Sequence, residues 1–251
     1  MQPAAAAQGR LPDAVTVSRA VQDEWRARIA AEYTSAAITQ HLVLWLIQAG
    51  APPDLIEAGL VIVGDELVHS RMSHEVYQAA GGTLPPAIDR DQLGLARTSE
   101  PLEHDILRVA VRVFCLGETV AVPLFSHLRE HCTIEPARAA LDRILRDEVR
   151  HRDFGWDVLD WLLAIDRDDG VPARVEAALP EMLDELAASY GMANEAVATD
   201  DGVLDDADRA WGLAPPREYA EILARTLDRD YRPRFQARGI HMPGEPAVTN
   251  L

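Results

Sequence analysis

Cysteine and aromatic residues are scarce in this sequence, and it contains neither a long apolar run nor a strand-like alternation. The two cysteines, Cys115 and Cys132, lie far apart, so they provide neither a disulfide framework nor a Cys-x-x-Cys metal site. The longest apolar run, residues 42–47, is too short to cross a bilayer, and the N-terminal segment lacks the apolar core of a signal peptide. We therefore expect a cytoplasmic protein that does not bind a membrane.

Basic residues are also few, because 24 lysines and arginines face 41 acidic residues and leave a formal net charge of −17. Such a surface repels nucleic acids and anionic lipids, so we expect neither as a partner. Hydrophobic residues make up 48% of the chain, enough to fill a core, and the abundance of alanine and leucine favours helix. The length of 251 residues allows one large domain or two small ones.

Apolar residues recur in steps of three and four along four long segments, which is the spacing of a helix with one buried face. Glycine and proline residues separate the segments. Pro123 lies inside the third segment, where we expect it to kink the helix or loosen its hydrogen bonding. The predicted helices span residues 18–48, 53–80, 101–132 and 135–166, with a connection of no clear period over residues 83–100.

The remainder of the chain has a weaker pattern, which predicts two further helices over residues 171–190 and 216–238. The acidic stretch between them, residues 191–215, is expected to form a surface loop. The predicted organisation is therefore a disordered segment (1–14), a four-helix unit (15–166), accessory helices packed on it (167–240) and a tail (241–251). With no strand pattern, the expected fold class is all-α.

Each of the four long helices carries a glutamate on its apolar stripe, where a hydrophobic residue belongs. A buried carboxylate costs several kcal/mol unless it is paired or bound to a metal. One such residue could reflect a misjudged register, but one on every helix requires a shared explanation. The four are Glu32, Glu66, Glu118 and Glu148.

Two of these glutamates belong to a repeated motif, Asp-Glu-x-x-His, at residues 65–69 and 147–151. On a helix, residues i and i+3 share a face, so the glutamate and histidine of each motif can bind one ion. A lone glutamate precedes each motif on the preceding helix, so the chain repeats a two-helix unit. Two such units facing each other give a four-helix bundle with a dimetal site. Its predicted ligands are Glu32, Glu66, His69, Glu118, Glu148 and His151.

This pattern resembles the ferritin-like superfamily of diiron and dimanganese carboxylate proteins, over about residues 18–165. The resemblance implies a ferritin-like four-helix bundle that holds two iron ions, with an iron–manganese or dimanganese centre also compatible. It implies that each motif histidine binds one ion, that the motif glutamates bridge the ions and that the lone glutamates complete the site. It further implies that Asp65 and Asp147 hydrogen-bond the ligand histidines and fix their tautomers.

Residues one helical turn from the ligands are small or apolar and are expected to line a cavity. The other histidines, including His127 and His131, have no ligand spacing and are expected at the surface. The predicted cavity residues are Ser35, Ala36, Thr39, Phe114, Cys115, Ala121 and Val122.

The expected function is a non-haem diiron oxygenase or oxidase that uses O₂ to oxidise a small molecule and receives electrons from a donor. A ferroxidase or iron-handling protein and a dimanganese catalase are the alternatives. Storage ferritins usually have one histidine in the site and a shorter chain, whereas the catalase differs only in its metal and its peroxide turnover. The sequence discloses neither substrate nor donor, and it is compatible with a homodimer.

Overall fold

Helices account for all the regular structure in the part of the chain that is described, which comprises residues 17–167, 170–189 and 204–244 of a computed structural model. The expectation of an all-α fold is confirmed. The predictions for residues 1–14 and for the end of the tail fall outside the described residues. The α-helices are α1 (Arg19–Gln48), α2 (Pro53–Ala79), α3 (Leu102–Val109), α4 (Thr119–His131), α5 (Glu135–Ile165), α6 (Gly170–Ser189), α8 (Asp206–Ala210), α9 (Pro216–Thr226) and α10 (Arg232–Gln236).

The ends of the long helices follow local chemistry. The Ser18 hydroxyl accepts a hydrogen bond from the Val21 amide and caps α1. Gly50 follows α1 with φ +74°, a left-handed conformation that glycine adopts without strain, and Pro53 begins α2. The predicted bounds of the first, second and fourth helices agree with α1, α2 and α5 to within one residue at each end.

The third predicted helix is continuous but irregular. A π-helical segment, Ala110–Glu118, joins α3 to α4, and it ends before Pro123, where the irregularity was expected. A π-helix has more residues per turn than an α-helix, and short π segments are frequent at functional sites. The segment ends on Glu118, so it sets the position of one predicted ligand.

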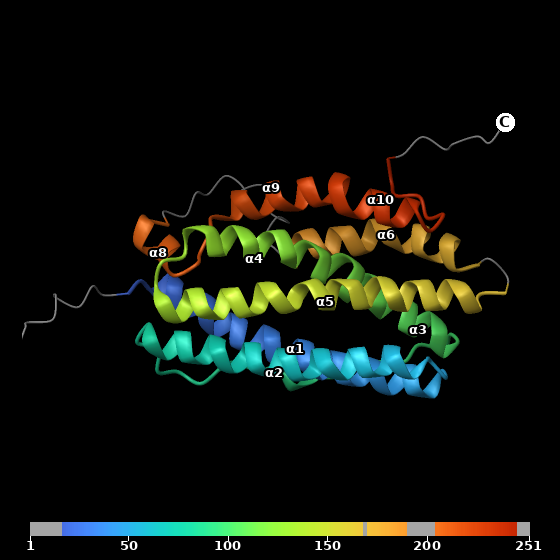
Figure 1. The fold of residues 1–251 in the computed structure, drawn as a ribbon, viewed down its shortest axis with the longest axis horizontal. Helices are drawn as coiled ribbons and strands as arrows, with labels where there is room; N and C mark the ends of the chain where they lie inside the picture. Colours follow the sequence, from blue (N-terminus) through green and yellow to red (C-terminus); the bar gives the residue numbers. More distant parts are fainter. Residues whose placement is uncertain (1–16, 168–169, 190–203, 245–251) are drawn as a thin grey trace, which may run out of the picture.

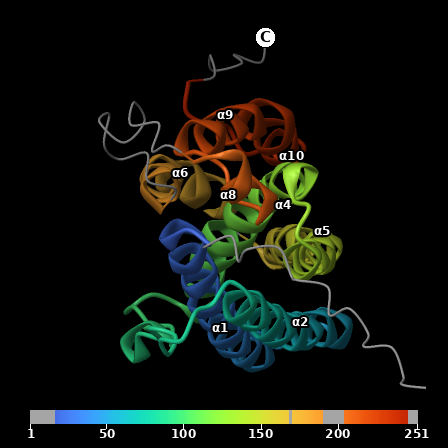
Figure 2. The ribbon, with the colours of Figure 1, turned by 90° about the vertical axis from the view of Figure 1, so that its left-hand side faces the viewer.

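Three layers of helices lie along a common long axis (Figures 1 and 2). The antiparallel pair α1 and α2 forms one outer layer, and α5 lies with the helix of α3, the π segment and α4 in the middle. Helices α6, α9 and α10 cover the middle layer on the side away from α2.

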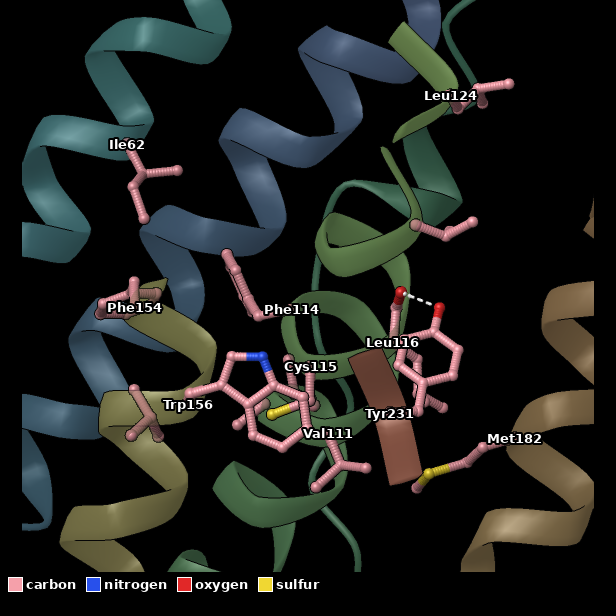
Figure 3. Close-up of a cluster of buried hydrophobic side chains, with 14 of the residues drawn as sticks. Ile62, Val111, Phe114, Cys115, Leu116, Leu124, Phe154, Trp156, Met182 and Tyr231 are labelled. Atoms are coloured by element: carbon pink, nitrogen blue, oxygen red, sulfur yellow. Dashed lines mark hydrogen bonds between the residues drawn. The ribbon is translucent and has the colours of Figure 1, made fainter. Parts of the chain in front are cut away.

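The π segment is buried between α5 and the C-terminal helices (Figure 3). The Phe114 and Phe154 rings meet edge to face with centroids 5.1 Å apart. The Tyr231 hydroxyl donates a 2.6 Å hydrogen bond to the Leu116 carbonyl. Tyr231 lies in a second π segment, Leu227–Tyr231, which interrupts the helix predicted over 216–238. A side chain at Gly155 would lie 2.3 Å from the Phe114 Cβ, so glycine permits the close approach of α5.

In the acidic stretch expected as a surface loop, residues 191–203 lie outside the described residues, and residues 204–215 are in part a packed element. Its described residues include α8, and Leu213 and Ala214 are buried. The Trp25 indole of α1 donates to the Trp211 carbonyl over 3.0 Å. The first residues of the predicted tail are also packed, because Met242 is buried in the core. Hydrophobic residues scattered among acidic ones thus gave too weak a periodicity to reveal this packing.

Within the described part of the chain, one helix, Leu102–His131, is long and apolar enough to cross a membrane when judged by length and composition alone. Its apolar window is 56% buried inside the structure, and the core helix of a soluble protein passes the same test. Two charged residues interrupt the window in the sequence, so a search for unbroken apolar runs does not find it.

Candidate metal centre

All six predicted ligands come together, and they do so as two groups of three. In each group one ligand atom from every residue lies within 4.8 Å of the others. Each group consists of a glutamate from outside the motifs, the histidine of one motif and the glutamate of the other motif. The groups are Glu32, His69 and Glu148, and Glu66, Glu118 and His151.

The two motif glutamates lie between the histidines. Glu66 places one oxygen 3.5 Å from His69 Nδ1 and the other 3.4 Å from His151 Nδ1. Glu148 does the same, with its oxygens 4.0 Å from His69 Nδ1 and 3.6 Å from His151 Nδ1. A carboxylate that offers one oxygen to each of two neighbouring positions has the arrangement of a bridging ligand.

Four atoms of this cluster are buried and have no hydrogen-bond partner among the described residues: Nδ1 of His69, Nδ1 of His151, Oε2 of Glu66 and Oε2 of Glu148. A single buried polar atom without a partner costs about 1–3 kcal/mol, and native proteins contain few of them. All four are ligand atoms of the types that iron and manganese bind. The donor set therefore fits two such ions, which would supply the missing partners.

The ionisation of the cluster shows how strongly its groups interact. Burial raises the pKa of Glu32 to about 7 and that of Glu148 to about 8. Burial opposes the charge of Glu66 as well, but the His151 and His69 rings hold the pKa of this carboxyl below its usual range. Despite burial, Glu32 and Glu66 raise the pKa of His69 to about 11. Without metal, the site therefore retains protons that bound cations would displace.

The two motif aspartates contact the histidines, but in a crossed manner. His69 Nε2 lies 3.2 Å from Asp147 Oδ2, and His151 Nε2 lies 3.5 Å from Asp65 Oδ2. Each aspartate thus approaches the histidine of the other motif. Because a carboxylate accepts the Nε2 proton, Nδ1 is left to face the glutamates.

Two arginines behind the histidines were not identified from the sequence. Arg150 donates to Asp65 over 2.7 Å and to Asp147 over 2.9 Å, and Arg143 also contacts both aspartates. These contacts hold the pKa of Asp147 at about 2 despite its burial. Their spacing in the sequence could have indicated this role. Arg143 and Arg150 lie four residues before and three residues after Asp147, so they share its helix face.

A cavity of about 520 Å³ opens onto the cluster and is lined by all four of its glutamates. Of the predicted cavity residues, Ser35 lines it and donates a 2.8 Å hydrogen bond to Glu66. Ala121 lines an adjoining cavity, which shares Ser35 and Glu118 with the first. The remaining five do not line either cavity: Ala36, Thr39, Phe114, Cys115 and Val122.

A third group of potential ligands corrects the expectation that the remaining histidines have no ligand spacing, although their expected place at the surface agrees with the structure. His127, Glu130 and His131 present ligand atoms within 4.8 Å of one another near the end of α4. This group is largely exposed, and His127 is hydrogen-bonded to Glu218 of α9. It therefore lacks the buried, unpartnered donors of the main cluster.

Comparisons of the chain with protein-family models, with curated proteins and with solved structures found no match. The interpretation of the site consequently depends on the residues and their geometry.

Proposed function

We propose that this chain is a ferritin-like dimetal oxygenase or oxidase that oxidises a small molecule with O₂ and draws electrons from a donor. The observation that carries the proposal is the pair of three-residue groups with Glu66 and Glu148 shared between two unpartnered histidine nitrogens. His69 with Glu32 would hold one ion and His151 with Glu118 the other. Iron ions bound there would supply the redox chemistry that activates O₂.

The protein's own residues orient the ligands. Asp147 and Asp65 hold the histidines from behind, and Ser35 fixes one oxygen of Glu66. The two histidines are completely buried, and the cavity reaches the four glutamates.

The size and lining of the cavity favour an organic substrate over the alternatives. A ferroxidase needs a path for iron and a catalase needs one for peroxide, whereas about 520 Å³ falls within the range of small-molecule binding sites. Leu124, Phe125 and Leu128 give this cavity an apolar wall, which neither iron nor peroxide requires.

The proposal is tested by loading the protein with Fe(II) under argon, measuring bound iron and then recording O₂ consumption. We expect about two ions per chain, and their loss in Glu66→Ala and Glu148→Ala. Glu75→Ala, at an exposed position of the same helix as Glu66, should retain both ions. Iron binding that survives both ligand substitutions contradicts the site assignment. Growth of a ferric mineral would indicate storage, and peroxide disproportionation by the manganese form would indicate a catalase.

A further inference from the structure

Arg28 has an unusual position for an arginine, because it is buried beside the proposed dimetal site. It lies on α1 one turn before Glu32, which corresponds to about 6 Å along the helix. Only 8% of the residue is exposed. Among the described lining residues of the 520 Å³ cavity, Arg28 is the one basic residue.

The guanidinium group is held in place from one side. Its Nε donates to Glu24 over 2.9 Å, and its Nη2 contacts the Gly212 carbonyl over 3.4 Å. The guanidinium carbon lies 4.8 Å from the centre of the Trp25 ring and 5.5 Å from that of Phe125. Aromatic faces of this kind fix the plane of the group.

The Tyr219 hydroxyl also interacts with the guanidinium, but one of the terminal nitrogens of the group still lacks a partner. Its Nη1 is buried and has no hydrogen-bond partner in the part of the chain that is described. The charge of Glu24 does not replace such a partner, because it reaches Nε and its side chain is 37% exposed to water. A buried cationic donor without an acceptor is unfavourable unless a ligand supplies one.

We infer that Arg28 binds a carboxylate group of the substrate, so that the substrate is a carboxylic acid with an apolar body. This inference rests on the proposed function, since it takes the cavity to be the substrate site. A carboxylate has two acceptor oxygens in the geometry that a guanidinium recognises. The apolar wall of Leu124, Phe125 and Leu128 would contact the body of the molecule between Arg28 and the metal ligands.

The C-terminal region acquires a role in this arrangement. Gly212 anchors the guanidinium through its carbonyl, and Ala214, Pro216 and Tyr219 complete the cavity wall. These residues come from the connection after α8 and from α9, outside the four long helical segments. The accessory region would thereby select the substrate rather than only stabilise the bundle.

Calorimetric titration tests the inference with two matched pairs of probes: octanoate with octanamide, and 3-phenylpropionate with 3-phenylpropanamide. The titrations use the full-length protein as purified and again after addition of Fe(II) under argon. We expect at least one acid to bind at least tenfold more tightly than its amide in the Fe(II)-treated protein. Equal affinity for acid and amide in both pairs overturns the inference without reference to any variant.

Variants then assign the preference to Arg28. Arg28→Gln should lower the affinity for the acid at least tenfold and leave the amide unchanged, whereas Arg28→Lys should retain part of the preference. The control is Arg19→Gln, at a position of α1 whose side chain is 88% exposed, and it should bind like the wild type. An acid preference that persists in a folded Arg28→Gln protein also overturns the inference. Because Arg28→Gln can fail to fold, Arg28→Lys gives a second test. An unchanged ratio of acid affinity to amide affinity in Arg28→Lys contradicts a contact in which the guanidinium donates to both carboxylate oxygens.

The two proposals fail separately. Acid binding through Arg28 in a protein that takes up no iron, or consumes no O₂ with either acid, rejects the oxygenase and keeps the carboxylate site. Iron-dependent O₂ consumption without a preference for either acid keeps the oxygenase and rejects the role of Arg28.

Discussion

Asp147 and His69 belong to different Asp-Glu-x-x-His motifs, yet His69 Nε2 lies 3.2 Å from the Asp147 carboxylate. The reciprocal contact joins Asp65 to His151. The crossing connects α2 and α5 directly behind the two proposed metal positions. The orientation of each histidine therefore depends on the other half of the repeat.

Replacing Asp147 with asparagine should weaken metal binding by about 10–100-fold, because a neutral amide orients His69 less firmly and loses the contacts with Arg143 and Arg150. Competition with a chromophoric chelator measures the affinity. The matched control, Asp142→Asn, lies on the same helix with a side chain 46% exposed and should leave the affinity unchanged. Equal affinities for the two variants would argue against an orienting role for Asp147.

Glu118→Gln should affect the metal-free and metal-treated proteins in opposite directions. Burial and the nearby charge of Glu148 raise the pKa of Glu118 well above its usual value, so the ionised form is unfavourable in the folded metal-free protein. The neutral glutamine should raise the Tm of the metal-free protein. It should also reduce the Tm increase that we expect Fe(II) or Mn(II) to produce in the wild type, because a proposed ligand is lost. Thermal unfolding with and without metal measures both effects, and a lower metal-free Tm with an intact metal response contradicts the assignment.

Gly155→Ala should destabilise the protein by about 1–3 kcal/mol, the usual cost of overpacking. The added Cβ would lie 2.8 Å from the Phe114 carbonyl carbon and 2.9 Å from the Cys115 nitrogen, so backbone must move. Gly64→Ala is the control, since a Cβ there meets no atom within 4 Å and alanine favours helix, by up to about 1 kcal/mol. Urea unfolding compares the two, and similar effects of both substitutions would show that α5 and the π segment are not in close contact.

Asp105→Asn should remove a pH-dependent contribution to stability. Burial favours the neutral acid, but hydrogen bonds from Arg97, Thr98 and Arg108 dominate and hold the pKa of Asp105 at about 2. Since an unfolded aspartate titrates near pH ~4, the folded state gains stability above that pH and loses the gain as pH falls towards 2. The variant should be less stable by roughly 2 kcal/mol at pH 7, and the difference from wild type should shrink between pH ~4 and ~2. Urea unfolding across this range measures it, and a difference independent of pH rejects this account.

The sequence by itself determined the four long helical segments and the six candidate ligands. Apolar periodicity, with glycine and proline between the periodic segments, fixes the position and length of these segments, because both are local properties of the chain. The six ligands could be predicted because a glutamate on an apolar stripe is unfavourable unless it binds a partner. The repeated motif then indicated that one metal site explains all four glutamates. Helix spacing then placed Glu66 with His69 on one face, and Glu148 with His151 on another.

Tertiary structure decided what depends on contacts between distant segments. The crossed pairing of aspartates and histidines follows from the packing of α2 against α5, and sequence spacing alone does not distinguish it from pairing within a motif. The π segment that ends on Glu118 packs against α5 and the C-terminal helices, and the apolar period of the sequence does not reveal it. Arg28 reads in the sequence as an ordinary helix arginine; only the packing of Gly212 and Phe125 around it buries its charge beside the site. Local pattern encodes which residues share a helix face, whereas the environment of that face is created by segments that meet only in the folded chain.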